Sequence, residues 1–81
     1  MEIEFDPAKD EANIAKHGIS LARAADIEVL AFDRIVRRGE VRLQVFGVID
    51  ERLYSLTIAF RPNVVRSISL RRAHLKELQH V

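Results

Sequence analysis

The second half of the chain alternates apolar and polar residues over three strand-length segments, and this alternation constrains the fold more than any other feature. The segments are residues 41–49, 52–61 and 64–71, and each has the two-residue period of a strand with one buried face. Asp50-Glu51 separates the first two segments, and a turn at residues 61–64, with Pro second and Asn third, separates the last two. The pattern predicts an antiparallel meander of three or four strands.

One face of this meander is predicted to be apolar. It collects the large side chains of the first two segments, which are Val41, Leu43, Val45, Ile49, Tyr54, Leu56, Ile58 and Phe60. In the last segment, strict alternation adds Arg66 to the apolar face. The opposite face then receives Ser67, Ser69 and Arg71. Because Arg42 shares this second face, we expect a polar surface with Arg42 and Arg71 at its centre.

The first half of the chain predicts a short strand and two helices. Residues 2–5 alternate acidic and apolar residues, as a half-buried strand does. Asp6-Pro7 is a helix start and Gly18 is a helix end, so a first helix is expected between them. Ser20 is the expected cap of a second helix over residues 21–31, and residues 72–79 predict a short C-terminal helix. This order indicates an α+β fold with helices covering one face of the meander.

Size and composition exclude several classes of protein. The 81 residues are expected to form one domain, residues 1–81. The absence of Cys excludes disulfides and thiolate metal sites, and the three His residues lack metal-ligand spacing, so no metal or cofactor is expected. No apolar run approaches the ~18 residues of a membrane span, and the acidic start is not a signal peptide. We therefore expect a cytoplasmic protein without a membrane partner.

Charge is divided unevenly along the chain. Residues 1–33 carry eight acidic and three basic residues, whereas residues 34–81 carry four acidic and ten basic residues, nine of them Arg. Arg binds phosphate and carboxylate with two parallel hydrogen bonds, which Lys cannot do. The second half of the chain therefore favours a surface for nucleic acid or another polyanion, with ordinary surface arginine as the alternative.

Metal-free RNA cleavage is one chemistry for which the sequence supplies groups. A base must accept the proton of the 2′-hydroxyl, an acid must protonate the 5′ oxygen, and cations must stabilise the phosphorane. The candidate bases and acids are His17, His74, Glu40 and Glu77, and the candidate cations are Lys9, Lys16, Arg42, Arg66, Arg71 and Arg72. Structural roles are also open: Glu77 could pair with a neighbouring Arg, and Arg66 could be a satisfied cation on an apolar face.

The sequence Lys16-His17-Gly18 has two interpretations. As the end of the first helix, it places two basic residues where positive charge suits the helix dipole. Alternatively, Lys9, Asn13, Lys16 and His17 lie along one side of that helix and could hold a phosphate.

Four segments, in order, resemble the BrnT toxins of bacterial type II toxin–antitoxin pairs. They are FDPAKDEANIAKHGIS, RGEVR, VFGVIDERLYSLTIAFR and VRSISLRRAHLKE. The family patterns K-x-x-x-N-x-x-K-H-G-V-S, G-E-x-R and R-I-I-S-A-R-x-A fall in register with these segments, and the resemblance covers almost the whole chain. The sequence departs from the family at Phe5, which replaces Trp, at Leu70, which replaces Ala, and at Val81, where Tyr often stands.

The resemblance implies a RelE-like fold and a metal-independent endoribonuclease that inhibits translation. It implies RNA as the substrate and a BrnA-like antitoxin with a ribbon-helix-helix region as the partner, so that DNA is contacted only indirectly through the antitoxin. With the residue-based arguments, it gives as candidate catalytic residues Arg71, Arg42, His17 and Glu40, and as candidate RNA-binding residues Lys9, Lys16, Arg66, Ser69 and Arg72. The alternative is a non-enzymatic or inactivated module that only binds an antitoxin or another acidic partner and cleaves no RNA.

Overall fold

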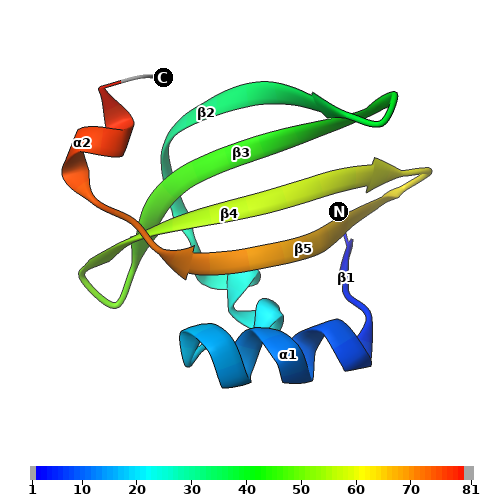
Figure 1. Ribbon diagram of the computed structural model, residues 1–81, viewed down its shortest axis with the longest axis horizontal. Coiled ribbons are helices and arrows are strands. Elements are labelled where there is room, and N and C mark those ends of the chain that lie inside the picture. The colour runs from blue at the N-terminus through cyan, green and yellow to red at the C-terminus, as the bar shows by residue number, and fades with distance from the viewer. Residues whose placement is uncertain (1, 80–81) are drawn as a thin grey trace.

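The computed structural model describes residues 2–79 and has an α+β fold (Figure 1). A five-stranded mixed sheet in the order β1-β5-β4-β3-β2 forms one layer, and the first two helical segments of the chain cover part of one of its faces. The elements are β1 (Glu2–Glu4), α1 (Pro7–His17), the 3₁₀ helix η1 (Leu21–Asp26), β2 (Glu28–Arg37), β3 (Glu40–Ile49), β4 (Arg52–Arg61), β5 (Val64–Arg72) and α2 (Leu75–Leu78).

Four strands, β2 to β5, form the antiparallel meander, and β1 adds a parallel edge strand beside β5. Two-residue turns join the four strands. Arg38-Gly39 and Asp50-Glu51 all have positive φ, which suits the right-handed twist of a tight hairpin. The turn predicted at residues 61–64 is confirmed, with Asn63 at φ 62° in its third position.

The expected bounds of α1 and the cap of η1 are confirmed. The Asp6 side chain accepts a hydrogen bond from the Ala8 N–H, and Pro7 is the first helical residue. Gly18 closes the helix at φ 73°, where a side chain would be strained. Ser20 caps η1, because its hydroxyl accepts a hydrogen bond from the Ala22 N–H.

The second helix predicted over residues 21–31 is wrong beyond residue 26. Leu21 and Ala24 are both buried at the three-residue spacing of a 3₁₀ helix, and the helix ends at Asp26. Residues 28–37 form β2, and a bulge between Val29 and Ala31 interrupts its pairing with β3. The bulge places apolar residues in succession, so the alternation expected of a strand is hidden in the sequence. The C-terminal helix is likewise shorter than predicted, because β5 extends through Arg72.

The hydrophobic core lies between η1 and the sheet. Leu21 and Leu70 are fully buried at its centre, and the remaining buried members are Ile19, Ala24, Val45, Ile49 and Leu56. Asn13 of α1 ties the helix to β5: its amide donates to the carbonyls of Ile19 and Leu70, at 2.8 and 2.9 Å, and accepts from the Leu70 N–H. This buried amide has partners for both of its polar atoms, which identifies Asn13 as a structural residue.

A bulge in β5 changes the faces predicted for its side chains. Thr57 pairs with Ser69 and Ile58 pairs with Ser67, so Ile68 is an extra residue. Ser67 is therefore buried on the apolar face, opposite Ile58, and Arg66 lies on the polar face, opposite Ala59. The sequence-based placement was wrong for these two residues because strict alternation fails across a bulge.

Candidate nucleic-acid interface

The polar face of the sheet and the adjacent side of α1 form a connected series of three hollows, which we call the cationic groove. The first, of about 210 Å³, is lined by Lys9, Ala12, Asn13, Lys16, His17, Ile68 and Ser69. The second, of about 220 Å³, is lined by Ile35, Arg37, Arg42, Thr57, Ile68 and Ser69, and the third, of about 330 Å³, by Arg37, Arg38, Glu40 and Arg42. Neighbouring hollows share residues, so the groove runs from α1 across the sheet to the β2–β3 turn.

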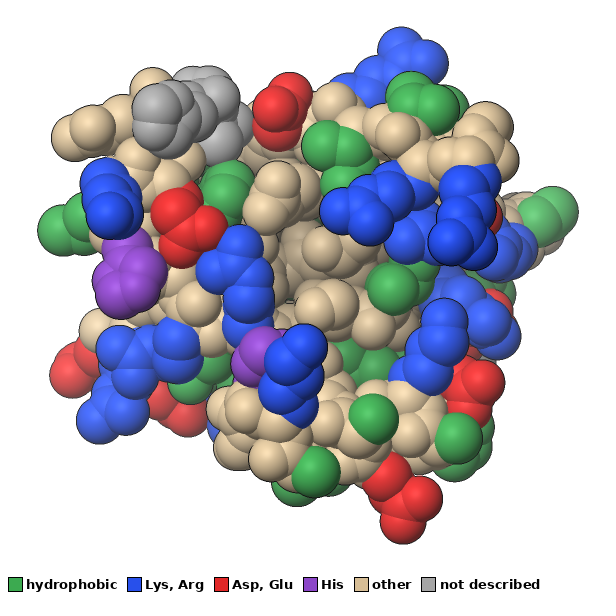
Figure 2. Space-filling view, viewed as in Figure 1, with side chains coloured by type: hydrophobic (Ala, Val, Ile, Leu, Met, Phe, Trp, Pro, Cys, Tyr) green, Lys and Arg blue, Asp and Glu red, His purple; other side chains and the backbone are tan. Residues whose placement is uncertain are grey.

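Figure 2 shows this basic character on one face of the molecule, where Lys and Arg side chains surround a hollow. Each part of the groove has its own source of charge. The helix contributes Lys9 and Lys16, and the β2–β3 hairpin contributes Arg37, Arg38 and Arg42. The pairing of β3 with β2 and β4 fixes Arg42 opposite Ile35 on one side and Ala59 on the other. The groove therefore combines a cationic surface with a rigid sheet floor.

Arg42 is the cation in the groove with an unsatisfied buried donor. Its side chain is 26% exposed, and its Nε is buried without a hydrogen-bond partner among the described residues. The closest carboxylate oxygen is Glu40 Oε2, 3.8 Å from Nη2, whereas Glu40 Oε1 accepts a hydrogen bond from Arg61 at 3.2 Å. Because this carboxylate is beyond hydrogen-bond distance, the terminal nitrogens of Arg42 can donate to an anionic ligand in the groove.

Six of the nine candidate site residues line the groove, namely Arg42, Lys9, Lys16, His17, Glu40 and Ser69. His17 is the last residue of α1 and is half-buried in the hollow that contains Ser69. Ser69 also lines the hollow that contains Arg42, so the hollow with the imidazole and the hollow with the guanidinium adjoin at this residue of β5.

Arg66 and Arg72 are placed away from the groove. Arg66 donates from Nε to Glu4 of β1 at 3.1 Å, near the edge of the sheet. Arg72 lies over the ring of Tyr54, with its guanidinium carbon 5.8 Å from the ring centroid, and Tyr54 packs against the core. Arg72 therefore stabilises the apolar face and is not brought together with the other candidates.

Arg71 is on the polar face but is held by Glu77 of α2. Its two terminal nitrogens donate to the two carboxylate oxygens at 3.3 and 2.9 Å, and one also donates to the Arg72 carbonyl. The same carboxylate accepts from the His74 N–H at 2.8 Å. Arg71 and then His74 lower the pKa of the Glu77 carboxyl to about 2. The pairing of Glu77 with a neighbouring Arg, left open by the sequence, is confirmed.

Replacing Glu77 by Gln is expected to lower stability at neutral pH by about 1 kcal/mol, since the pair is partly exposed. The pKa of Glu77 is lower in the folded protein than the ordinary 4.5, so its contribution is present above that value and is lost as the pH falls toward 2. Thermal unfolding at several pH values would measure this: the difference between parent and variant should shrink below pH 4.5. A difference that is constant with pH would contradict it, and Glu11→Gln on the exposed side of α1 is the control.

The sequence analysis missed Arg37, Arg38 and Thr57 as groove residues. Thr57 faces Ser69 across the β4–β5 pair, whereas Arg37 ends β2 and Arg38 is the first residue of the β2–β3 turn. The sequence Arg37-Arg38-Gly39-Glu40 could have indicated this hairpin, because a Gly between two strand-like segments is typical of a tight turn. It was overlooked because β2 itself was not predicted.

Two other kinds of site have no counterpart in residues 2–79. No three His, Cys, Asp or Glu side chains lie together as metal ligands would. Within the same residues, no helix has the length and apolarity required to cross a membrane.

The fold and the groove define the class as a small α+β domain with a cationic groove on its sheet. The sequence of residues 5–77 matches the family described as ribonuclease toxin, BrnT, of type II toxin-antitoxin system, and the chain belongs to this family. The crystal structure of the Brucella abortus ribonuclease toxin BrnT is similar, with a TM-score of 0.68 and 25% sequence identity. The alignment covers 91% of this chain and 97% of that one. No curated protein sequence matched the chain.

Proposed function

We propose that this ribonuclease toxin is a metal-independent endoribonuclease of RelE-like type that inhibits translation by cleaving RNA in the cationic groove. The observation that carries the proposal is the Arg42 guanidinium, which lines two of the three hollows beside Arg37 and has no carboxylate oxygen of the described residues nearer than 3.8 Å. A phosphate of the RNA backbone would accept hydrogen bonds from the terminal nitrogens of Arg42, and the guanidinium would neutralise its charge.

The proposed reaction is transfer of the phosphate to the neighbouring 2′-oxygen. His17 accepts the proton of the 2′-hydroxyl, the oxygen attacks phosphorus, and the bond to the 5′ oxygen breaks. Water supplies the proton that the 5′ oxygen takes up, and His17 returns its own proton to solvent, so the products are a 2′,3′-cyclic phosphate and a 5′-hydroxyl. Arg42 stabilises the negative charge of the phosphorane. Glu40 lies in the third hollow, where its carboxylate is 3.8 Å from the Arg42 guanidinium and accepts a hydrogen bond from Arg61.

The other candidates are assigned to binding. Lys9, Lys16 and Ser69 contact backbone phosphates and sugars on the helix side of the groove, and Arg37 and Arg38 do so at the hairpin. Arg71 is a positioning residue for α2, because its guanidinium is already occupied by Glu77. In the cell, the partner of the toxin would be a BrnA-like antitoxin with a ribbon-helix-helix region, which provides the contact with DNA, and the pair would act in the cytoplasm.

The test is incubation of the purified chain with RNA in the presence of EDTA. We expect fragments with 5′-hydroxyl and 2′,3′-cyclic phosphate ends, and we expect induction of the chain alone in bacteria to reduce the rate of protein synthesis. Intact RNA at every protein concentration would contradict the proposal and favour the non-enzymatic binding module. Cleavage that appears only after Mg²⁺ is added would contradict metal independence.

A further inference from the structure

The apolar face of the sheet is only partly covered. The helical segments α1 and η1 pack mainly against β5, and η1 also against β1, so the far side of the sheet extends beyond them. The large apolar side chains exposed there are Val29 (53% exposed), Phe32 (62%), Val36 (62%), Val41 (40%) and Phe60 (47%). We call this set the open apolar patch. Exposure of this many large apolar side chains on a small domain indicates an interaction site.

Strand pairing places the patch on the same face as the core. Phe32 lies opposite Val45, which is buried, and Val36 lies opposite Val41. Phe60 lies opposite Val65 in the β4–β5 pair. Directly opposite residues of two antiparallel strands point to the same face. The patch therefore continues the hydrophobic core rather than forming an unrelated surface.

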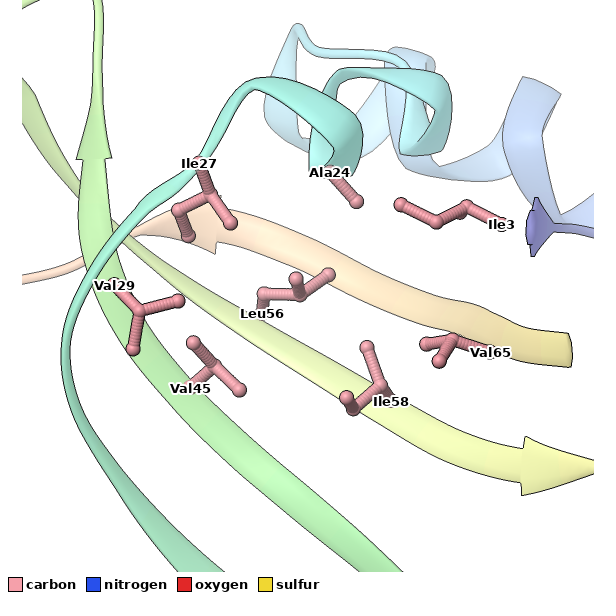
Figure 3. A pocket seen from close by; sticks show the side chains of 8 residues that line it. All are labelled: Ile3, Ala24, Ile27, Val29, Val45, Leu56, Ile58 and Val65. Atoms are coloured by element: carbon pink, nitrogen blue, oxygen red, sulfur yellow. The ribbon is translucent and has the colours of Figure 1, made fainter. Parts of the chain in front are cut away.

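A cavity of about 220 Å³ lies where the patch meets η1 (Figure 3). It is lined only by aliphatic side chains, which are Ile3, Ala24, Ile27, Val29, Val45, Leu56, Ile58 and Val65. Figure 3 shows these side chains converging from η1 and from the strands. The cavity has the volume and lining to accept large apolar side chains from a partner.

The patch also carries a cation that lacks a partner. Arg34 of β2 lies opposite Leu43, between Phe32 and Val36 on the same face, and is exposed. No carboxylate of the described residues lies within ion-pair distance of its guanidinium. A partner with an acidic side chain among its apolar ones would be complementary to this arrangement.

A second copy of the chain fits the patch poorly. In a two-fold symmetric dimer the same patch forms both sides of the interface. Each copy would then contribute another Arg34, and the residues that the β2–β3 register places on this face include no carboxylate to pair with it. Two copies could also pair along β2, which is an edge strand of the sheet. If the two-fold axis passed through Asp33 or Arg34, that residue would face its own copy, and like charges would lie opposite each other. A different protein with acidic side chains therefore complements the patch better than a second copy does.

We infer that the open apolar patch is the docking surface for an amphipathic, acidic helix of the antitoxin, which lies beside η1 and places apolar side chains in the cavity. This inference rests on the proposed function for the existence of that partner. A helix is the element that would complete the layer begun by η1, and its apolar face would cover the exposed side chains of β2. Its acidic side chains would pair with Arg34.

This placement separates antitoxin docking from the cationic groove. The alternation along β2 and β3 puts the patch on one face of the sheet, whereas Arg42 and Ile35 lie on the other. A substitution in the patch should therefore weaken the complex without removing RNA cleavage. A substitution in the groove should do the reverse.

The test measures the affinity of the purified chain for the antitoxin encoded with it, by calorimetry, and maps the interface by hydrogen–deuterium exchange. Phe32→Asp combined with Val36→Asp should weaken binding at least 100-fold, and Arg34→Glu about 10-fold, while Asp33→Asn on the opposite face of β2 should have no effect. Both target side chains of the double variant are mostly exposed, so its circular dichroism should be unchanged. The antitoxin should protect the amides of β2.

Unchanged affinity of both patch variants, or protection confined to the groove, would overturn the inference. Arg34→Glu keeps the test decisive if the double variant does not fold, because it changes only one exposed side chain. Self-association of the chain alone that the same variants abolish would assign the patch to a second copy instead, and would also overturn it. Absence of RNA cleavage by the parent chain would contradict the proposed function alone, since affinity is measured without RNA.

Discussion

Replacement of Arg42 by Gln is expected to slow RNA cleavage by about 100-fold or more. The wild-type guanidinium lines two hollows, with a terminal nitrogen 3.8 Å from Glu40, and its Nε is buried without a partner among the described residues. Gln cannot carry the positive charge that stabilises the phosphorane, and it cannot offer two parallel donors to one phosphate. The variant should fold normally, because the change removes an unsatisfied donor rather than a hydrogen bond of the folded protein.

The measurement is the cleavage rate of one RNA by both proteins as a function of RNA concentration. A lower kcat at similar KM would place the guanidinium on the phosphate in the transition state, whereas a higher KM alone would indicate simple binding. Arg52→Gln is the matched control, because Arg52 is an exposed arginine at the start of β4 that lines none of the three hollows. Equal rates for the parent and the Arg42 variant would remove Arg42 from the catalytic site.

The structure also changes the relative importance of the candidate arginines. Sequence alternation made Arg42 and Arg71 equivalent, because both were expected at the centre of one polar face. In the structure, Arg71 forms two hydrogen bonds with Glu77, while Arg42 has only a distant contact with Glu40. Such pairing depends on α2 folding back toward β5, which residue periodicity does not describe. The sequence could therefore place the arginines but could not rank them.

The elements that were predicted correctly are those with strong local signals. The caps of α1, the Asp50-Glu51 turn and the alternation of β3 and β4 follow from local geometry and were found from the sequence. The two main errors coincide with β-bulges. One lies between Val29 and Ala31 and hid β2, and the other lies at Ile68 and exchanged the faces of Ser67 and Arg66.

Bulges are difficult to predict because they depend on packing between elements. At Ile68 the extra residue brings Ser69 and Arg71 onto the same face as Arg66, and in this way it helps to build the groove. At Leu30 the bulge follows the point where the chain leaves η1 and crosses close to β3. Neither position has Gly, the residue most often associated with a bulge. The cationic groove therefore depends on a β-bulge, which the sequence pattern does not indicate.

The second large effect is expected at Gly47, where Gly47→Ala should destabilise the fold by about 3 kcal/mol. Gly47 lies opposite Val29 in β3, at the point where the chain passes from η1 into β2. A β-carbon at this position would collide with the Glu28 carbonyl oxygen and would lie 2.7 Å from the Ile27 side chain. Because part of this obstacle is backbone, the side-chain rotamers cannot relieve it, and β2 would have to move away from β3.

Thermal unfolding of the two proteins would measure this effect, and a domain of this size should lose about 12 °C or more in Tm. Gly39→Ala is the informative comparison, because Gly39 has no neighbouring atoms in the way but has a φ of 78°. That variant should lose only about 1 kcal/mol, the cost of a side chain in the left-handed region. If Gly47→Ala is no more destabilising than Gly39→Ala, then β2 is not held against β3 by close backbone packing. The hairpin that carries Arg37, Arg38 and Arg42 would then be less rigid than the groove requires.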